Sequence, residues 1–303
     1  MTRVAGIDCG TNSIRLLIAD IEEGTLTDVV RQMRVVRLGQ DVDRTGRLAP
    51  EAIERTRVAL LDYAALAHQH GAERVRMVAT SATRDAANRA DFVTMVQGVL
   101  GAEPEVITGR EEAELSFAGA TSVLPETDGP LLVADIGGGS TELVRGGDGQ
   151  LRSHSMDVGC VRMTERHLHS DPPTDAQVAA TIADVRAAVQ AARADVPLDP
   201  DVTFVGVAGT VTTITAIALG LGRYDPGAIH GATIPADQVR DVTDRLLHMT
   251  HDQRAALPVM HPGRVDVIGA GALVLRTLVD EIGVAAVIAS EHDILDGIAL
   301  SIG

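Results

Sequence analysis

The chain has 303 residues, a formal net charge of −16 and no lysine, so all 26 of its basic residues are arginines. The acidic balance argues against duplex nucleic acid or an anionic membrane as a partner, because either would need a broad basic face. The lack of lysine excludes a Walker-type phosphate loop, a Schiff-base enzyme and a pyridoxal phosphate enzyme.

The first part of the chain is predicted to open with a strand, a tight turn and a second strand. Apolar runs at 3–8 and 14–21 flank the turn CGTNS. An extended segment at 27–38 precedes a helix at 50–71, which has a proline near its start and a glycine at its end. The elements expected next are a strand at 75–80, a helix at 83–100, a short strand at 106–107 and a helix at 109–124.

The segment PETDGP, residues 125–130, is rich in turn formers and is the predicted linker. After it the pattern restarts with strands at 131–135, 141–145, 151–157, 202–207 and 284–289, and helices around 160–169, 174–195, from 210, 235–248, 263–282 and 293–302. Alternating strands and helices favour an α/β fold. We therefore expect two domains, 1–124 and 125–303, with a C-terminal helix at about 291–303 that can pack back on the first.

The cysteine pattern bears on the cellular compartment. Cys9 and Cys160 form no C-x-x-C pair, so we expect neither a disulfide framework nor a zinc site. The N-terminal segment lacks an apolar stretch of signal-peptide length. Both features predict a cytoplasmic protein. Aromatic residues make up only 2% of the chain, which disfavours base stacking on nucleic acid.

One motif occurs twice in the chain. GIDCGTNSIRLL at 6–17 and VADIGGGSTELV at 133–144 share D-x-G-x-x-S-x-x-L at an offset of 127 residues. The matched pairs are Asp8/Asp135, Gly10/Gly137, Ser13/Ser140 and Leu16/Leu143. A repeat at this spacing fits two related domains.

The second copy has the chemistry of a phosphate loop. Gly137, Gly138 and Gly139 can bring several backbone amides to one point, and Ser140 or Thr141 can add a hydroxyl donor. Asp135 cannot bind phosphate itself, so its natural role is to hold a divalent cation or a water. An ordinary glycine-rich hairpin is the alternative, which the matching copy at Asp8 makes less favourable.

A third candidate loop is VGVAGTVTTITAI, residues 205–217, where a strand runs into Gly209-Thr210 and a helix. Helix N-termini attract anions through their free amides and the helix dipole. By itself this junction is also a common structural connection.

Two strand-turn-strand loops followed by a strand-Gly-Thr-helix loop resemble the actin-like ATPase superfold. The segments DCGTNSIRLLIAD, TSATRDAANR, ITGREEAELSFAGA, DIGGGSTELV, DVGCVRM, VAGTVTTITAI and DVIGAGALVL resemble, in this order, the exopolyphosphatase and guanosine pentaphosphatase family over most of 4–300. The resemblance implies an α/β fold of two actin-like (ribonuclease H-like) domains, with the two repeated loops lining an interdomain cleft.

The resemblance also implies the site residues. Glu112 would be the base that activates the attacking water, and Asp135 and Glu142 would act catalytically by positioning metal and water. The phosphate-binding set would be Asp8, Gly10, Thr11, Asn12, Ser13, Arg15, Arg84, Gly137, Gly138, Gly139, Ser140, Thr141, Gly209 and Thr210. From the residues alone, the favoured interpretation of Glu112 is a structural one, a helix-start acid stabilised by the dipole.

The function implied is a metal-dependent phosphoanhydride hydrolase that removes terminal phosphate from inorganic polyphosphate. Longer family members continue into further C-terminal helical domains, so short chains are the expected substrates here. Mg²⁺ or Mn²⁺ is the expected cofactor, and a homodimer is the expected assembly. A guanosine pentaphosphate phosphohydrolase of the stringent response, with guanosine penta- or tetraphosphate as ligand, is the main alternative. An actin-fold phosphotransferase and a non-catalytic alarmone-binding regulator are more distant ones.

Overall fold

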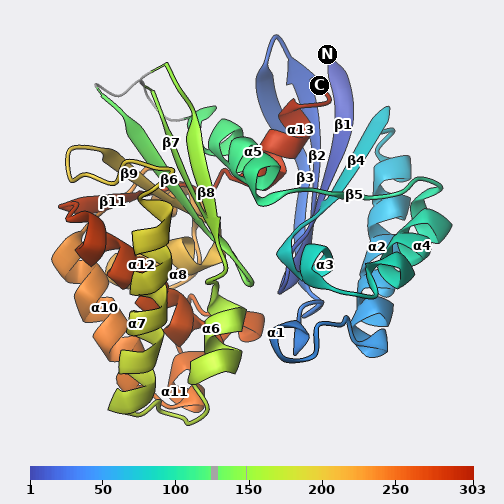
Figure 1. The fold of residues 1–303 in the computed structure, drawn as a ribbon. Coiled ribbons are helices and arrows are strands. Elements are labelled where there is room, and N and C mark those ends of the chain that lie inside the picture. The colour runs from blue at the N-terminus through green and yellow to red at the C-terminus, as the bar shows by residue number, and fades with distance from the viewer. Residues whose placement is uncertain (124–128, 148) are drawn as a thin grey trace. The chain divides into compact units, whose positions relative to one another are not determined.

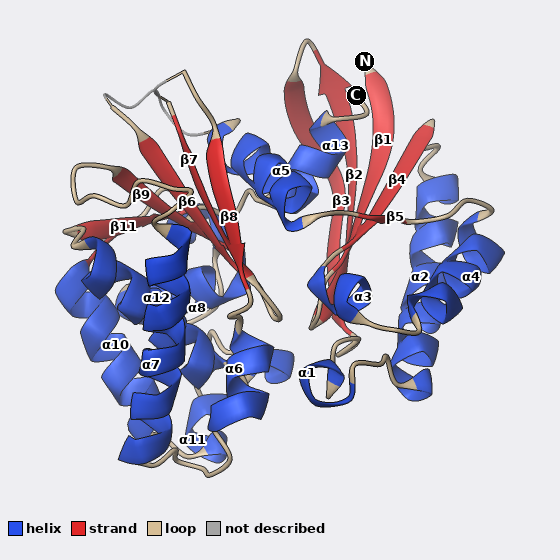
Figure 2. Cartoon of the chain, viewed as in Figure 1, coloured by secondary structure: helices blue, strands red, loops and turns tan. Residues whose placement is uncertain are grey.

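The computed structural model describes residues 1–123, 129–147 and 149–303. The chain divides into two compact units, of which the first comprises Met1–Ser122 and Asp293–Gly303 and the second Val123–His292 (Figure 1). Residues 125–128 of the predicted linker lie outside the described residues. Each unit is a sheet with packed helices, so the predicted α/β class is confirmed (Figure 2).

The first unit has a five-stranded sheet of order β3-β2-β1-β4-β5. Its strands are β1 (Thr2–Cys9), β2 (Ser13–Glu22), β3 (Thr25–Val35), β4 (Arg74–Ala79) and β5 (Glu105–Val106). The first three strands form an antiparallel meander, and β4 and β5 run parallel to β1.

Helices cover both faces of this sheet. They are α1 (Val42–Thr45), α2 (Pro50–Gln69), α3 (Ser81–Asp85), α4 (Arg89–Leu100), α5 (Gly109–Thr121) and α13 (Ile294–Leu300). Alternate residues of β1 face opposite ways, so Ile7 packs with α2 and α4, whereas Val4 packs with Leu295 and Ala299 of α13. Figure 1 shows α5 and α13 on the face opposite α2 and α4.

The helix predicted at 83–100 is two helices. Helix α3 ends at Asp85, and Ala86 has extended backbone angles before α4 begins at Arg89. The cause is the Asn88 side chain, which accepts a hydrogen bond from the amide of Leu48 at 2.8 Å and donates to its carbonyl at 3.1 Å. This pairing with a distant segment stabilises the interruption between α3 and α4.

The second unit has a six-stranded sheet of order β10-β11-β9-β6-β7-β8. Its strands are β6 (Leu131–Ile136), β7 (Thr141–Gly146), β8 (Arg152–Met156), β9 (Thr203–Val207), β10 (Thr233–Pro235) and β11 (Ala286–Ala289). The run β8-β7-β6-β9-β11 has the same order and strand directions as β3-β2-β1-β4-β5. The repeated motif therefore lies at the start of two sheets of the same ribonuclease H-like topology.

The helical segments of the second unit are α6 (Cys160–His167), α7 (Asp175–Ala192), α8 (Ala208–Ala218), α9 (Pro226–Ile229), α10 (Ala236–His248), α11 (His251–Ala255), the 3-10 helix η1 (Pro262–Arg264) and α12 (Ile268–Ile282). All but α11 and η1 contribute apolar side chains to the core of this unit. Apolar side chains bury α12 on most of its sides, with Leu275 and Leu278 in one core with Leu132. The helix predicted at 263–282 begins later because His261 caps the separate turn η1. Within the described ranges, no helix is long and apolar enough to cross a membrane.

Candidate functional site

The two copies of the repeated motif form the same turn. The Gly10 amide donates to the carbonyl of Ser13 at 3.0 Å, and the Gly137 amide donates to the carbonyl of Ser140 at 3.0 Å. These bonds close the turns between β1 and β2 and between β6 and β7. Each turn leaves its first aspartate, Asp8 or Asp135, near the end of the preceding strand.

In the second unit the glycine turn lies against the start of α6. The amides of Cys160 and Val161 donate to the carbonyls of Gly137 and Gly138 at 3.0 and 2.8 Å. Gly159 makes this approach possible, because a Cβ at that position would lie 2.4 Å from the Gly138 oxygen. Helix α6 thus engages the carbonyl side of the turn.

The amide side of the turn consequently points away from α6. In a trans peptide the N–H lies opposite the preceding C=O, so the amides of Gly138 and Gly139 are directed away from the helix. Neither amide has an acceptor within the described part of the chain. The buried hydroxyl of Ser140 likewise lacks a partner there, whereas Thr141 donates to the carbonyl of Val158 at 2.6 Å. This arrangement offers backbone and hydroxyl donors to an anion.

Two carboxylates stand beside this turn. Asp135 and Glu142 are directly opposite each other in the β6–β7 ladder, so their side chains share one face of the sheet. Both are buried, and Ser155 continues the row on β8, where its hydroxyl donates to Glu142 Oε1 at 2.7 Å. Ser155 was absent from the sequence prediction, although its register opposite Glu142 is a signal for it.

In the first unit the corresponding pair is an acid and a base. Arg15 lies opposite Asp8 in the β1–β2 ladder and donates from Nε and Nη2 to Asp8 Oδ2 at 2.9 and 2.7 Å. Burial raises the pKa of Asp8 despite the opposing charge of Arg15. Asp8 Oδ1 is buried and has no hydrogen-bond partner among the described residues.

The rest of the first turn is fixed by neighbouring segments. Thr11 shares a 2.9 Å hydrogen bond with the hydroxyl of Ser81 at the start of α3. The Asn12 carbonyl accepts the amides of Val36 and Arg37 at 3.0 and 2.9 Å. These contacts hold the turn against the segments that follow β3 and β4.

Glu112 lies in the first turn of α5. A capping box between Thr108 and Glu111 begins this helix, and Glu112 is buried directly after it. Arg84 Nη1 donates to Glu112 Oε2 at 3.0 Å and to the carbonyl of Ile107 at 3.1 Å. The structure therefore joins two residues predicted for different roles, with Arg84 fixing the Glu112 carboxylate.

The third predicted loop connects β9 to α8. Ala208 has a φ of 68°, in the left-handed region that costs a non-glycine residue energy. Next to it, the Arg264 guanidinium lies so close to Gly209 that an added Cβ would be 2.3 Å from the guanidinium carbon. Arg264 also donates to Thr213 Oγ1 at 3.1 Å. No sequence pattern points to Arg264, since it lies 54 positions after Thr210.

Thr210 and Cys160 meet next to α12. A Cβ at Gly271 would lie 2.6 Å from Thr210 Oγ1 and 3.2 Å from the Cys160 Cβ, so only glycine fits there. Burial raises the pKa of the Cys160 thiol, while its hydrogen bond with Thr210 and the charge of Arg264 oppose that rise. Cys160 therefore stays protonated and serves the packing of this region.

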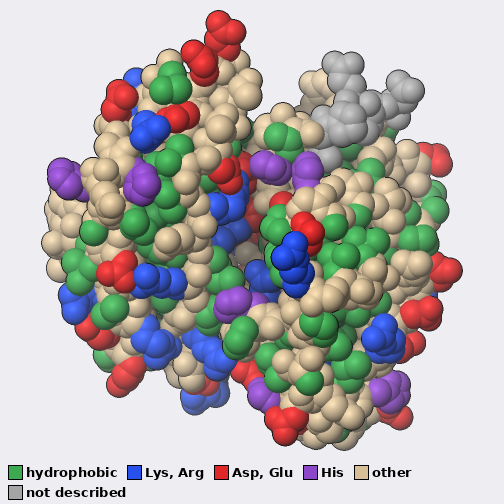
Figure 3. Space-filling model, turned by 180° about the vertical axis from the view of Figure 1, so that it is seen from behind, with side chains coloured by type: hydrophobic (Ala, Val, Ile, Leu, Met, Phe, Trp, Pro, Cys, Tyr) green, Lys and Arg blue, Asp and Glu red, His purple; other side chains and the backbone are tan. Residues whose placement is uncertain are grey.

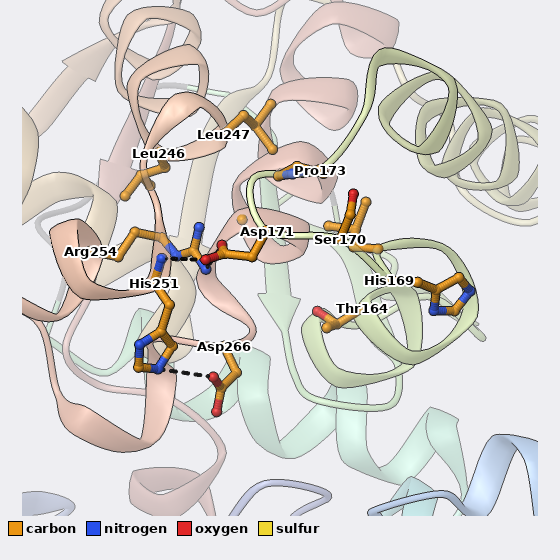
Figure 4. Close-up of a pocket in the computed structure, with 12 residues that line it drawn as sticks. Thr164, His169, Ser170, Asp171, Pro173, Leu246, Leu247, His251, Arg254 and Asp266 are labelled. Carbon is orange, nitrogen blue, oxygen red and sulfur yellow. Dashed lines mark hydrogen bonds and ion pairs between the residues drawn. The ribbon is translucent and has the colours of Figure 1, made fainter.

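A separate cavity of about 260 Å³ lies in the second unit, beyond the C-terminal end of α6 (Figure 4). Arg254 is buried there, and its nitrogens donate to the carbonyls of Val265 and Met249 and to Asp171. The cavity is lined by Thr164, Leu168, His169, Ser170, Asp171, Pro173, Leu246, Leu247, His251, Arg254, Asp266 and Gly269. None of the residues predicted for phosphate binding lines it.

Comparison with known proteins gives the same assignment as the motifs. Residues 17–302 match the Ppx/GppA phosphatase family. The chain is 55% identical to Exopolyphosphatase 2 of Mycobacterium tuberculosis, with 100% of this chain and 99% of that protein covered.

Two solved structures agree along their whole lengths. The crystal structure of an exopolyphosphatase-like protein superimposes with a TM-score of 0.97 at 46% identity and covers 100% of this chain and 98% of its own. The Ppx/GppA protein of Aquifex aeolicus does so with a TM-score of 0.83 at 32% identity and covers 99% and 97%. With these matches, the repeated turns and the shared sheet order, the chain belongs to the Ppx/GppA phosphatase family.

Proposed function

We propose that the protein is an exopolyphosphatase that hydrolyses the terminal phosphate of inorganic polyphosphate. The observation that carries the proposal is the turn at 137–140, where two amides directed away from α6 lie next to the buried Asp135–Glu142 pair. The full-length similarity to the Mycobacterium tuberculosis protein named Exopolyphosphatase 2 supports it.

The chain can bind phosphate without lysine. Amides of Gly138 and Gly139 and the Ser140 hydroxyl are donors whose positions are fixed before the substrate arrives. Such concave sets of donors bind anions through partial charges, so the site needs no flexible cationic side chain. Such a site would let a protein with a net charge of −16 recognise a polyanion.

The carboxylate pair fits a divalent cation. Mg²⁺ is usually bound through one or two carboxylates together with substrate phosphates and water, and Asp135 and Glu142 supply two carboxylates on one face. A Mg²⁺ or Mn²⁺ ion held by the pair would neutralise phosphate charge. Ser155 would keep one oxygen of Glu142 oriented.

Glu112 is the proposed base. Phosphoryl transfer needs an oriented nucleophile in line with the leaving oxygen, and the protein contributes positioning and charge stabilisation. Arg84 fixes Glu112 Oε2, so the carboxylate can accept a hydrogen bond from the attacking water in a defined direction. As the water oxygen bonds to the terminal phosphorus, its proton would pass to Glu112, the bridging P–O bond breaks, and orthophosphate and the shortened polyphosphate leave.

Short chains are the proposed substrates. On the face drawn in Figure 3, arginines are interspersed with acidic, histidine and apolar side chains. Of the arginines between 31 and 47, Arg31, Arg34 and Arg44 form ion pairs with aspartates. Their charges are thus already partly neutralised, so they would hold the tail of a long polymer weakly.

A phosphate-release panel tests the proposal. The substrates are short and long polyphosphate, guanosine pentaphosphate and ATP, each with Mg²⁺, Mn²⁺ or EDTA. We expect phosphate release from polyphosphate that requires a divalent ion. Turnover that persists in EDTA would contradict the role of Asp135 and Glu142, and release from no polyphosphate would overturn the function.

Guanosine pentaphosphate is the second candidate substrate. Its terminal phosphoanhydride presents the same chemistry to the donors at 137–140, and the family to which the chain belongs bears both names, Ppx and GppA. Faster release from guanosine pentaphosphate than from short polyphosphate in the panel would favour it.

A further inference from the structure

The Arg15 guanidinium is divided between two aspartates. Its Nε and Nη2 both donate to one oxygen of Asp8, Oδ2, and its Nη1 donates to Asp293. Both aspartates are buried, with exposed fractions of 4% for Asp8 and 3% for Asp293. The cluster therefore has two acids for one base, and Asp8 Oδ1 has no partner in the described ranges.

A second arginine–aspartate pair in the same ladder shows the ordinary geometry. Arg3 lies directly opposite Asp20, as Arg15 lies opposite Asp8. Arg3 donates from Nε to Asp20 Oδ1 and from Nη2 to Asp20 Oδ2, both at 2.8 Å. This two-pronged contact engages both carboxylate oxygens, as arginine–carboxylate pairs frequently do. Arg3 Nη1 also has a partner, the carbonyl of His70 at 3.1 Å, so the pair at Arg15 differs in that its third member, Asp293, is a buried carboxylate.

Asp293 is itself held firmly. It is the N-cap of α13, where its Oδ1 accepts the amide of Leu295 at 3.0 Å and its own amide donates to Asp296 Oδ2 at 3.0 Å. Its carbonyl packs on α5 so closely that a Cβ at Gly119 would lie 1.8 Å from the oxygen. Asp293 therefore has a fixed position and can hold the Arg15 guanidinium in place.

We propose that Asp293 is a positioning residue: by holding Arg15 Nη1 it prevents the guanidinium from engaging both oxygens of Asp8 and keeps Asp8 Oδ1 open. An open, buried carboxylate oxygen in a cluster of net negative charge is an acceptor that a hydrogen-bond donor or a hydrated cation would satisfy. The identity of the donor that binds Asp8 Oδ1 rests on the proposed function. The division of the Arg15 nitrogens between Asp8 and Asp293 does not.

The test compares two asparagine substitutions on one helix. Asp293→Asn keeps an acceptor for the amide of Leu295 but removes the charge that holds Arg15. Asp296→Asn keeps an acceptor for the amide of Asp293 and changes the contact with Arg31, which does not touch Asp8. Asp296→Asn is thus the matched control for the loss of one charge at the start of α13.

We expect Asp293→Asn to raise the Mg²⁺ concentration for half-maximal polyphosphate hydrolysis by about 10-fold, the usual scale for losing an outer-shell partner. Asp296→Asn should change it by less than about two-fold, and the two variants should lose similar thermal stability. Equal effects of both variants on the Mg²⁺ dependence would overturn the proposal. If Asp293→Asn does not fold, Asp293→Ser replaces it, since serine is also a good N-cap.

A binding measurement separates this inference from the proposed function. Calorimetric titration with magnesium tripolyphosphate should give weaker binding to Asp293→Asn than to the wild type or to Asp296→Asn. If the wild type hydrolyses polyphosphate and all three proteins bind tripolyphosphate equally, the role of Asp293 is wrong while the function stands. If the wild type neither binds nor hydrolyses polyphosphate, the proposed function itself is wrong.

Discussion

Arg15 and Glu142 occupy the same position in the two copies of the repeated turn, each directly across its ladder from the first aspartate of its copy. In the first copy this pairing places a base against Asp8, whose carboxylate is partly neutralised. In the second copy it places two buried acids side by side, the pair that we propose to hold a divalent cation. One exchange at this position therefore separates an acid–base pair from a pair of acids.

The hydroxyl of Ser155 is expected to support cation binding through Glu142. Ser155→Ala should raise the Mg²⁺ concentration for half-maximal hydrolysis by about 10-fold, because an outer-shell hydrogen bond is lost. A metal titration of polyphosphate hydrolysis measures this. Ser155→Thr should restore the wild-type value, and Ser153→Ala, two residues earlier on the same strand opposite Val144, is the control. An unchanged titration for Ser155→Ala would remove Ser155 from this role.

Glu112 is expected to act as the base. Glu112→Gln should lower kcat by about 100-fold or more, the usual scale for losing general-base help, while tripolyphosphate binding and the thermal midpoint stay near those of the wild type. Glu111→Gln is the neighbouring control, because Glu111 caps α5 through the Thr108 amide. Similar losses of kcat in both variants would move the role away from Glu112.

Gly159 is expected to be essential to the glycine turn. A methyl group in Gly159→Ala would lie 2.4 Å from the Gly138 oxygen, so the turn or α6 must move, at a cost of about 1–3 kcal/mol. Denaturant unfolding and phosphate release should both show a loss. In Gly98→Ala nothing lies within 4 Å of the new Cβ, and this exposed helix position should gain about 0.5–1 kcal/mol with unchanged activity. Wild-type activity in Gly159→Ala would show that the turn tolerates displacement.

The pH dependence of stability is expected to include a contribution from His261. Burial and then the charge of Arg264 lower the pKa of His261, and its Nδ1 accepts the amide of Gly263 at 3.1 Å. Because the unfolded chain binds this proton more readily, the contribution is present above the ordinary pKa of about 6.5 and is lost as the pH falls.

Thermal unfolding at pH values above and below the ordinary histidine pKa of about 6.5 measures the contribution of His261 to stability. The wild type should lose more stability on acidification than His261→Asn, whose side chain can still accept the Gly263 amide at every pH. Parallel curves for the two proteins would exclude the contribution from His261.

Long polyphosphate is expected to be released between cleavages. Processive cleavage needs basic surface that retains the polymer by neutralising its phosphates, and Arg31, Arg34 and Arg44 are engaged with aspartates. Gel analysis of partly digested long polyphosphate should therefore show a smear of intermediate lengths. Full-length polymer beside terminal products, with nothing between them, would contradict distributive release.

Local patterns predicted the fold well. The prediction of two strand-turn-strand motifs is confirmed. Each turn is closed by a hydrogen bond between residues three apart, from Gly10 to Ser13 and from Gly137 to Ser140. Such geometry is set by neighbouring residues, and glycine and alternating apolar residues report it directly in the sequence.

Contacts between distant segments could not be predicted in the same way. Asp293 pairs with Arg15 across 278 positions, and the residue pattern of neither segment predicts contact with the other. The break at Asn88 and the approach of Arg264 to Gly209 depend likewise on which segments the sheets bring together. Ser155 is intermediate, since counting the register outward from Asp135 and Glu142 would have reached it.

The division of the chain also sets the order in which its parts can be completed. Residues 123–292 of the second unit leave the ribosome as one continuous stretch, whereas the first unit must wait for residues 293–303. Until then β1 and β2 lack the apolar side chains of Leu295 and Ala299, and Arg15 lacks one of its two acidic partners. During synthesis the part of the protein that begins first is therefore finished last, against the usual N-terminal-first order of domain folding.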